Sequence, residues 1–398
     1  MKTAGSISLH NHLDQSTHIT WHGMLSLLAL MHVLLYVCLS ALRGFPSRPL
    51  RDAEFFRKAI KAKLALPCTP QYVVTPVKTH GQNVEYKSWP YLSPIDWLEK
   101  LMIDNRDALV PWEPSSIKDF WTTWLKDHPL DEFHDGSWPL ERIIPLQLWG
   151  DEGTLRANSW LLVTLQSALS PPEVRNLSQA SRYPLFSFPV EAYVKDPETN
   201  VNLSLEMLLE KISKDFNKLL IEGFATKHGH FYGRLIALKG DWKWLVQALN
   251  LVRSPGSDMI CPFCHAGKTN MLFTNVRDDA AWANTLFSSA PWNVYPNLME
   301  IKFFRLEMVM FDLMHVWHLG VGRDIIGTCI KELTKAKIFV GRKIDDRLQS
   351  AYQSLRSWAR EHHKTLAIKR FTKENLEWYS NTCPEPCTIF IRHRIIVC

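Results

Sequence analysis

The order of apolar patterns in the middle of the chain constrains its fold more than any other feature of the sequence. Two apolar runs, 142–153 and 159–169, predict an antiparallel hairpin. The first run is broken at Gly150, and residues 150–158, "GDEGTLRAN", have the composition of the connecting turn. The segment 188–196 has the composition of a third strand. Residues 203–225 then repeat leucine, isoleucine and phenylalanine at helical intervals, and 230–241 is a further strand-like run. Strands, a helix and a later strand in this order predict an α/β core.

Two acidic residues end strand-like runs in the same way. Asp151 ends the run "IPLQLWGD", and Asp241 ends the run "RLIALKGD". Carboxylates on neighbouring strands can hold the two divalent ions, about 3.5–4 Å apart, that assist phosphodiester transfer. An aspartate after a strand is also common as the N-cap of the next helix. The pattern therefore leaves a metal ligand and a helix cap as alternatives for Asp241.

Composition excludes little beyond disordered and fibrous proteins. The chain has 398 residues, of which 46% are hydrophobic and 22% are charged, as in ordinary globular proteins. This length predicts two or three domains. The formal net charge of +6 is compatible with a polyanionic partner such as nucleic acid but does not require one.

The cysteines indicate a metal site rather than a disulfide framework. Eight cysteines in a chain of this length are sparse, which suits a reducing compartment. Cys261 and Cys264 form a CxxC motif, and His315 and His318 are the next closely spaced ligand-type residues. Together they would make a closed Cys2His2 zinc site, with buried reduced cysteines or a redox pair as alternatives. Other closely spaced residues of these types are His228, His230, Cys383 and Cys387.

The N-terminal region contains an apolar segment. Residues 21–42 hold no Asp, Glu, Lys or Arg and are long enough to span a bilayer. The flank 43–63 is rich in Lys and Arg and would keep the following chain on the cytoplasmic side. The alternative is a hydrophobic helix buried against the body of the protein. Residues 68–92, with several prolines, predict an extended loop.

Four segments carry a resemblance to a known group of proteins. They are "IPLQLWGDEGTLRANSWLLVTLQSAL", "GDWKWLVQALNL", "ICPFCHAGK" and "FDLMHVWHLGVGRDIIGT". Together they resemble transposase-like proteins of large algal genomes, which are distantly similar to CACTA-type DDE/D cut-and-paste transposases of plants and fungi. The resemblance covers roughly residues 90–390. In the transposases a [Cys/Asp]-x-x-His signature lies in a helical insertion, and Asp312 and His315 match it here.

The resemblance implies an architecture and an activity. The expected fold is an RNase H-like α/β core interrupted by a mainly α-helical insertion, with a helical N-terminal region. The expected parts are 1–89, then 90–250 with the core, then 251–398 with the CxxC motif, the insertion and a truncated C-terminal part. Asp151 and Asp241 would bind Mg²⁺ or Mn²⁺ and act on DNA, and a structural Zn²⁺ and a homo-oligomer are further expectations.

The third acid of the catalytic set has no unique match in this sequence. Glu332 is taken as the catalytic residue, and the other candidates are Glu374, Glu377 and Glu385. Because none lies in a matching motif, we expect a degenerate copy with weak or no DNA cleavage. The alternatives are a non-enzymatic, zinc-stabilised DNA- or protein-binding remnant and a single-pass membrane protein. The expected location is nuclear or cytoplasmic, with membrane anchoring through 21–42 as the alternative.

Overall fold

The computed structural model of the chain divides into two compact units, Met1–Met310 and Phe311–Cys398. It describes residues 68–79, 83–104, 109–110, 115–129, 131–155, 158–170, 181–254, 256–366, 368–376 and 378. The apolar segment 21–42, predicted as a membrane span or a buried helix, lies outside the described residues. Among the helices that the structure describes, none has both the length and the apolarity to cross a bilayer.

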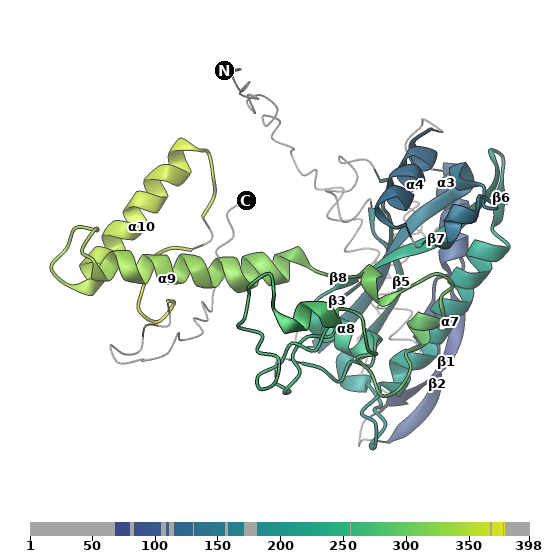
Figure 1. Cartoon of the computed structure of the whole chain (residues 1–398), viewed down its shortest axis with the longest axis horizontal. Helices are drawn as coiled ribbons and strands as arrows, with labels where there is room; N and C mark the ends of the chain where they lie inside the picture. The colour runs from purple at the N-terminus through teal and green to yellow at the C-terminus, as the bar shows by residue number, and fades with distance from the viewer. Residues whose placement is uncertain are drawn as a thin grey trace, which may run out of the picture. The chain divides into compact units, whose positions relative to one another are not determined.

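The first unit is built on a mixed six-stranded sheet (Figure 1). Its strand order is β5-β4-β3-β7-β6, and β8 also pairs with β7. The antiparallel pairs are β3 with β4, β4 with β5 and β6 with β7, whereas β3 and β7 run parallel. The strands are β3 (Ile143–Leu155), β4 (Asn158–Ser167), β5 (Tyr183–Pro189), β6 (Phe224–Thr226), β7 (Gly229–Gly240) and β8 (Val309–Phe311).

The predicted α/β class and the hairpin of β3 and β4 are confirmed, but two boundaries differ. The sequence places a turn directly after Gly150, whereas β3 continues to Leu155 because Asp151 and Gly153 still pair with β4. The third strand, predicted at 188–196, overlaps β5 by two residues only, because β5 runs from Tyr183 to Pro189. Proline has no N–H for ladder pairing, and a short 3₁₀ turn follows it.

Residues predicted as a loop at 68–92 form a two-stranded antiparallel sheet instead. Its strands are β1 (Gln71–Lys78) and β2 (Val84–Tyr91). Tyr72 and Tyr86 of this sheet are exposed, and its other residues include two buried runs, 75–77 and 89–91. The loop prediction was wrong because it took the prolines as strand breakers. Both strands of a two-stranded sheet are edge strands, and an edge strand tolerates the missing N–H of proline.

In the described part of the first unit, four α-helices accompany the sheets (Figure 1). The predicted amphipathic helix is α7 (Leu203–Ile221), and its leucine-rich face packs against β1 and β7. Its N-cap is Asn202, whose side chain accepts a hydrogen bond from the backbone N–H of Leu205 at 3.2 Å. The other three helices are α3 (Pro94–Asp104), α4 (Ser115–Asp127) and α8 (Trp242–Ala248).

The described part of the second unit is helical. A π-helical turn, Met314–Val321, leads into α9 (Gly322–Lys335), and α10 (Ile344–Glu361) follows. This unit has its own hydrophobic cluster, separate from the core of the first unit. The buried residues of the cluster are Leu348, Ala351, Tyr352, Ile368, Phe371, Leu376 and Trp378.

Candidate metal-binding site

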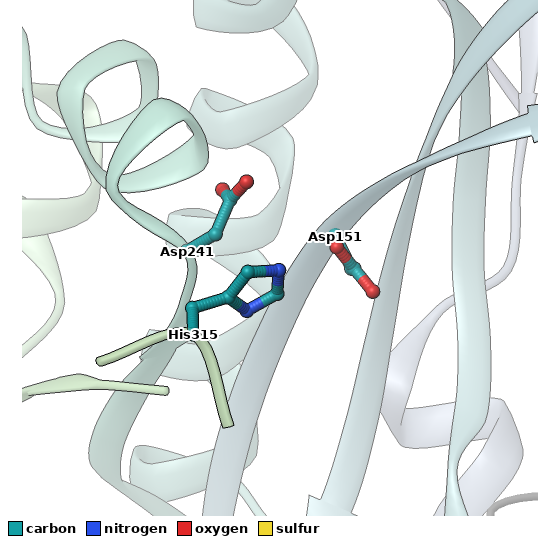
Figure 2. Close-up of side chains that lie close together, drawn as sticks. All are labelled: Asp151, Asp241 and His315. Carbon is teal, nitrogen blue, oxygen red and sulfur yellow. The ribbon is translucent and has the colours of Figure 1, made fainter. Parts of the chain in front are cut away.

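Asp151 and Asp241 lie side by side at one edge of the sheet. The last parallel pair of β3 and β7 is Gly150 with Gly240, and each aspartate directly follows one of these glycines. An oxygen of Asp151 lies within 4.8 Å of an oxygen of Asp241. Figure 2 shows Asp151 on its strand and Asp241 where α8 begins. The predicted adjacency of the two carboxylates is confirmed.

The alternative interpretation of Asp241 as a helix cap is also correct. Its Oδ1 accepts a hydrogen bond from the backbone N–H of Trp244 at 2.8 Å, which makes Asp241 the N-cap of α8. The cap engages one oxygen, and a carboxylate has two. A cap and a cation ligand are therefore compatible roles for this side chain.

The side chain of Trp244 requires glycine at both positions that precede the aspartates. A Cβ added at Gly150 would lie 2.2 Å from the indole of Trp244, and a Cβ at Gly240 would lie 2.2 Å from the same ring. Trp244 is fully buried and belongs to α8. Only glycine leaves room for the ring at both positions, and the ring in turn holds α8 against both strands. The site therefore rests on packed, regular structure.

Glu152, the neighbour of Asp151, joins β3 to α8. Its side chain forms an ion pair with Lys243 and accepts a hydrogen bond from Gln247 at 3.2 Å. Gln247 in turn accepts one from Asn202, the N-cap of α7, at 2.8 Å. These contacts fix the start of α8, and with it Asp241, relative to β3.

Two cations lie on the face of Trp149, two residues before Asp151. The guanidinium carbon of Arg182 is 4.1 Å from the ring centroid, and Nζ of Lys239 is 5.3 Å from it. Lys239 also donates to Gln147 at 2.9 Å. This group of cations was not predicted from the sequence. The signal available was alternation, since residues two apart on a strand share a face of the sheet.

In the second unit, Asp312 and His315 form the pair that the sequence motif predicts. Nδ1 of His315 lies 2.7 Å from Oδ2 of Asp312, and Oδ1 of Asp312 accepts from the backbone N–H of Met314 at 2.9 Å. A carboxylate at Nδ1 favours the tautomer that leaves Nε2 as the metal-binding or acceptor atom. His315 is also labelled in Figure 2.

The other predicted site residues are not brought together by the described side chains. Cys261 and Cys264 are free thiols, and no described cluster of three or more ligand-type groups includes them. The side chain of His318 is outside the described set. Glu332, on α9, is exposed and pairs with Lys335 at 2.7 Å. The zinc site and the role of Glu332 both stay predictions.

No protein-family model matches the sequence, and no curated protein matches it. The fold class and the pair of carboxylates are therefore the basis on which function is inferred.

Proposed function

We propose that the chain is a transposase-derived protein whose α/β unit binds a divalent cation at Asp151 and Asp241 and acts on DNA phosphodiesters. The observation that carries the proposal is the equivalent position of the two aspartates. Gly150 and Gly240 are the last pair of the parallel register between β3 and β7, and each aspartate directly follows one of them. An oxygen of Asp151 lies within 4.8 Å of an oxygen of Asp241. Rigid neighbouring strands are what a carboxylate metal site for phosphoryl transfer requires.

The strand order supports an RNase H-like core. Such a core has its first acid on the first strand and its second acid after the fourth strand, with those two strands adjacent. Here β3, β4 and β5 form the antiparallel part, α7 follows, and β7 returns beside β3 in parallel. Asp151 is on the first of these strands, and Asp241 directly follows β7. The topology thus favours this core over other α/β arrangements.

The ligand chemistry suits a hard cation. Two carboxylates this close repel each other, and a bound cation would relieve the repulsion. Oxygen ligands favour Mg²⁺ or Mn²⁺, whereas zinc sites more often use sulfur and nitrogen. When bound there, the cation supplies Lewis-acid stabilisation of charge on a phosphoryl oxygen. Asp151 is exposed, so a phosphate can reach it from solvent.

His315 stays a candidate metal ligand of the second unit, as the sequence motif predicts. Asp312 would orient the ring through Nδ1, as carboxylates do for metal-binding histidines.

The cations beside Trp149 favour a polyanionic substrate. Arg182 and Lys239 lie over the ring of Trp149, two residues before Asp151. Guanidinium and ammonium groups bind phosphate oxygens, so a DNA backbone could be held next to the cation site. Cleavage is expected to be weak, because Glu332 is engaged with Lys335 and no other third acid is assigned.

A plasmid-nicking assay tests this proposal. Purified protein is incubated with supercoiled DNA and Mn²⁺, alongside Asp151→Asn, Asp241→Asn and the exposed-acid control Asp119→Asn. We expect slow nicking that both site variants abolish and the control retains. Nicking that persists in Asp151→Asn, or that does not depend on the metal, would reject the assignment.

A further inference from the structure

Arg253, in the first unit, is a buried arginine without a carboxylate partner. Its side chain is 5% exposed. Among the residues that the structure describes, no Asp or Glu forms an ion pair with it, and it donates instead to the carbonyl of Cys264 at 3.0 Å and to Oγ of Ser289 at 2.5 Å. Arg234, which is also buried, is paired with Asp131. A buried charge without an opposite charge is costly, so the surroundings of Arg253 indicate a missing anion.

Backbone pairing places Arg253 and Ser289 on facing segments. Leu251 and Trp292 form an antiparallel bridge, two residues before Arg253 and three residues after Ser289. The residues that follow α8 therefore run beside the residues that precede Trp292, in the opposite direction. This pairing brings the guanidinium to the hydroxyl of Ser289.

The imidazole of His265 reaches the same hydroxyl from a third segment. Its Nε2 lies 2.7 Å from Oγ of Ser289. The N–H of His265 donates to Oγ1 of Thr285 at 2.9 Å, and the N–H of Phe287 donates to the carbonyl of Phe263 at 2.6 Å. These hydrogen bonds tie the turn at His265 to the segment that carries Ser289. A guanidinium, a hydroxyl and an imidazole thus meet at one point.

The thiol of Cys264 does not supply the missing negative charge. Burial and contact with Cys261 hold the pKa of this thiol above its ordinary value, and they outweigh the opposite effects of Arg253 and of the N–H of Ala266. The thiol is therefore neutral at physiological pH. Arginine keeps its proton in proteins, so the guanidinium stays charged. The counter-charge must come from a ligand.

We propose that Arg253, Ser289 and His265 form a phosphate-binding site. A guanidinium has five N–H donors, and the hydrogen bonds to Cys264 and Ser289 engage two of them. Its planar fork matches two oxygens of a phosphate group. The hydroxyl and a protonated imidazole can donate to further oxygens, of which a phosphate has more than a carboxylate.

The site is open to a ligand from solvent and is independent of the cation site. Ser289 and His265 are half-buried, so a phosphate group can reach the hydroxyl and the imidazole while Arg253 lies behind them. Neither Asp151 nor Asp241 takes part. Free phosphate and the backbone of a nucleic acid offer the same ligand chemistry.

Calorimetric titration of the full-length protein with inorganic phosphate, at constant ionic strength in chloride, tests the proposal. Wild type should bind phosphate saturably. Arg253→Gln should weaken binding by at least about tenfold, because it removes a hydrogen-bonded charge. Ser289→Ala should weaken it as well, and Arg253→Lys, which keeps the charge without the fork, should be intermediate. The matched control Arg277→Gln changes an exposed arginine of the same segment and should bind phosphate as wild type does.

Fluorescence anisotropy with a short DNA duplex, in buffer without divalent metal, separates the two sources of phosphate. A loss of duplex affinity in Arg253→Gln but not in Arg277→Gln would identify the nucleic-acid backbone. Unchanged duplex affinity together with lost phosphate binding would identify free phosphate. Circular dichroism checks the fold of each variant, and Ser289→Ala serves for the comparison if Arg253→Gln does not fold. Wild type that binds neither probe, or equal affinities for both probes in wild type, Arg253→Gln and Ser289→Ala, would overturn the proposal.

Discussion

At the scale of single residues, Asp241 shows that a structural role and a functional role can share one side chain. Its Oδ1 caps α8 through the N–H of Trp244, and its carboxylate lies beside that of Asp151. Asparagine caps helices about as well as aspartate but carries no negative charge. Substitutions at this position can therefore separate the cap from the cation site.

We predict that Asp241→Asn keeps the stability of the protein and loses cation binding, whereas Asp241→Ala loses both. The alanine variant should cost about 1 kcal/mol of unfolding free energy, because the N–H of Trp244 loses its acceptor. Urea unfolding followed by tryptophan fluorescence measures the difference. A destabilisation of the asparagine variant equal to that of the alanine variant would contradict the separation of roles.

A buried ion pair next to the sheet gives the clearest electrostatic prediction. Arg234 on β7 donates two hydrogen bonds to Asp131, at 2.7 and 2.9 Å, and neither side chain is exposed. The guanidinium also lies 4.2 Å from the ring centroid of Phe133. Burial by itself raises the pKa of Asp131, but hydrogen bonds from Arg234, the N–H of Phe133 and Trp124 outweigh it and lower the pKa.

Asp131→Asn should destabilise the fold by about 3–5 kcal/mol, because it leaves the Arg234 charge buried without a counter-charge. The pH dependence follows from the lowered pKa of Asp131. The contribution of the pair is present above the unfolded-state value of about 3.9 and is lost as pH falls through the lower folded-state pKa. Urea unfolding between pH 7 and pH 3, with Asp119→Asn as control, measures both effects. If Asp131→Asn had the same unfolding free energy as Asp119→Asn at neutral pH, the stabilising role of the Asp131–Arg234 pair would be refuted.

At the scale of elements, the junction of β3, β7 and α8 depends on glycine. Trp244 fills the space above Gly150 and Gly240, which are paired in the parallel register. Gly153, later on β3, has nothing within 4 Å of an added Cβ. The strand therefore contains both a position that demands glycine and a matched position that does not.

Gly150→Ala should cost about 1–3 kcal/mol of stability, because the new methyl group collides with the buried indole. It should also displace α8, and thereby weaken Mn²⁺ binding at Asp241. Gly153→Ala should change stability by no more than about 0.5 kcal/mol. Thermal unfolding and a Mn²⁺ titration of both variants measure these effects. Equal behaviour of the two alanines would show that the indole does not constrain Gly150.

The sequence predicted these elements to different degrees. Helix α7 was predictable because its apolar residues recur at helical spacing over five turns. The turn after Gly150 was misplaced because Asp-Glu-Gly has turn composition, yet cross-strand pairing with β4 extends β3 through it. The positions of Asp151 and Asp241 followed from strand adjacency. The Trp244 packing and the Arg182 contact with Trp149 are tertiary, and periodicity does not report them.

At the scale of the whole molecule, the residues that the structure describes form two hydrophobic clusters. The larger one belongs to the first unit and includes Leu208 of α7, and the smaller one belongs to the second unit and includes Leu348 of α10. Both leucines are fully buried. Units with separate cores commonly unfold in separate transitions.

Calorimetry should therefore resolve two transitions with separable mutational effects. Leu348→Ala is expected to destabilise its own unit by about 2–5 kcal/mol and to leave the other transition in place. Leu208→Ala should destabilise the first unit and leave the transition of the second unit in place. One cooperative transition, shifted equally by either substitution, would show that the two units unfold together.

Cation binding at the paired aspartates is tested most directly by Mn²⁺ titration of the full-length protein, monitored by electron paramagnetic resonance. Wild type and Asp119→Asn should bind Mn²⁺ with the same affinity, and Mg²⁺ should compete. Asp151→Asn and Asp241→Asn should each weaken binding by at least about tenfold, which corresponds to about 1.4 kcal/mol. Equal Mn²⁺ affinity in wild type and both site variants would contradict a cation site at Asp151 and Asp241.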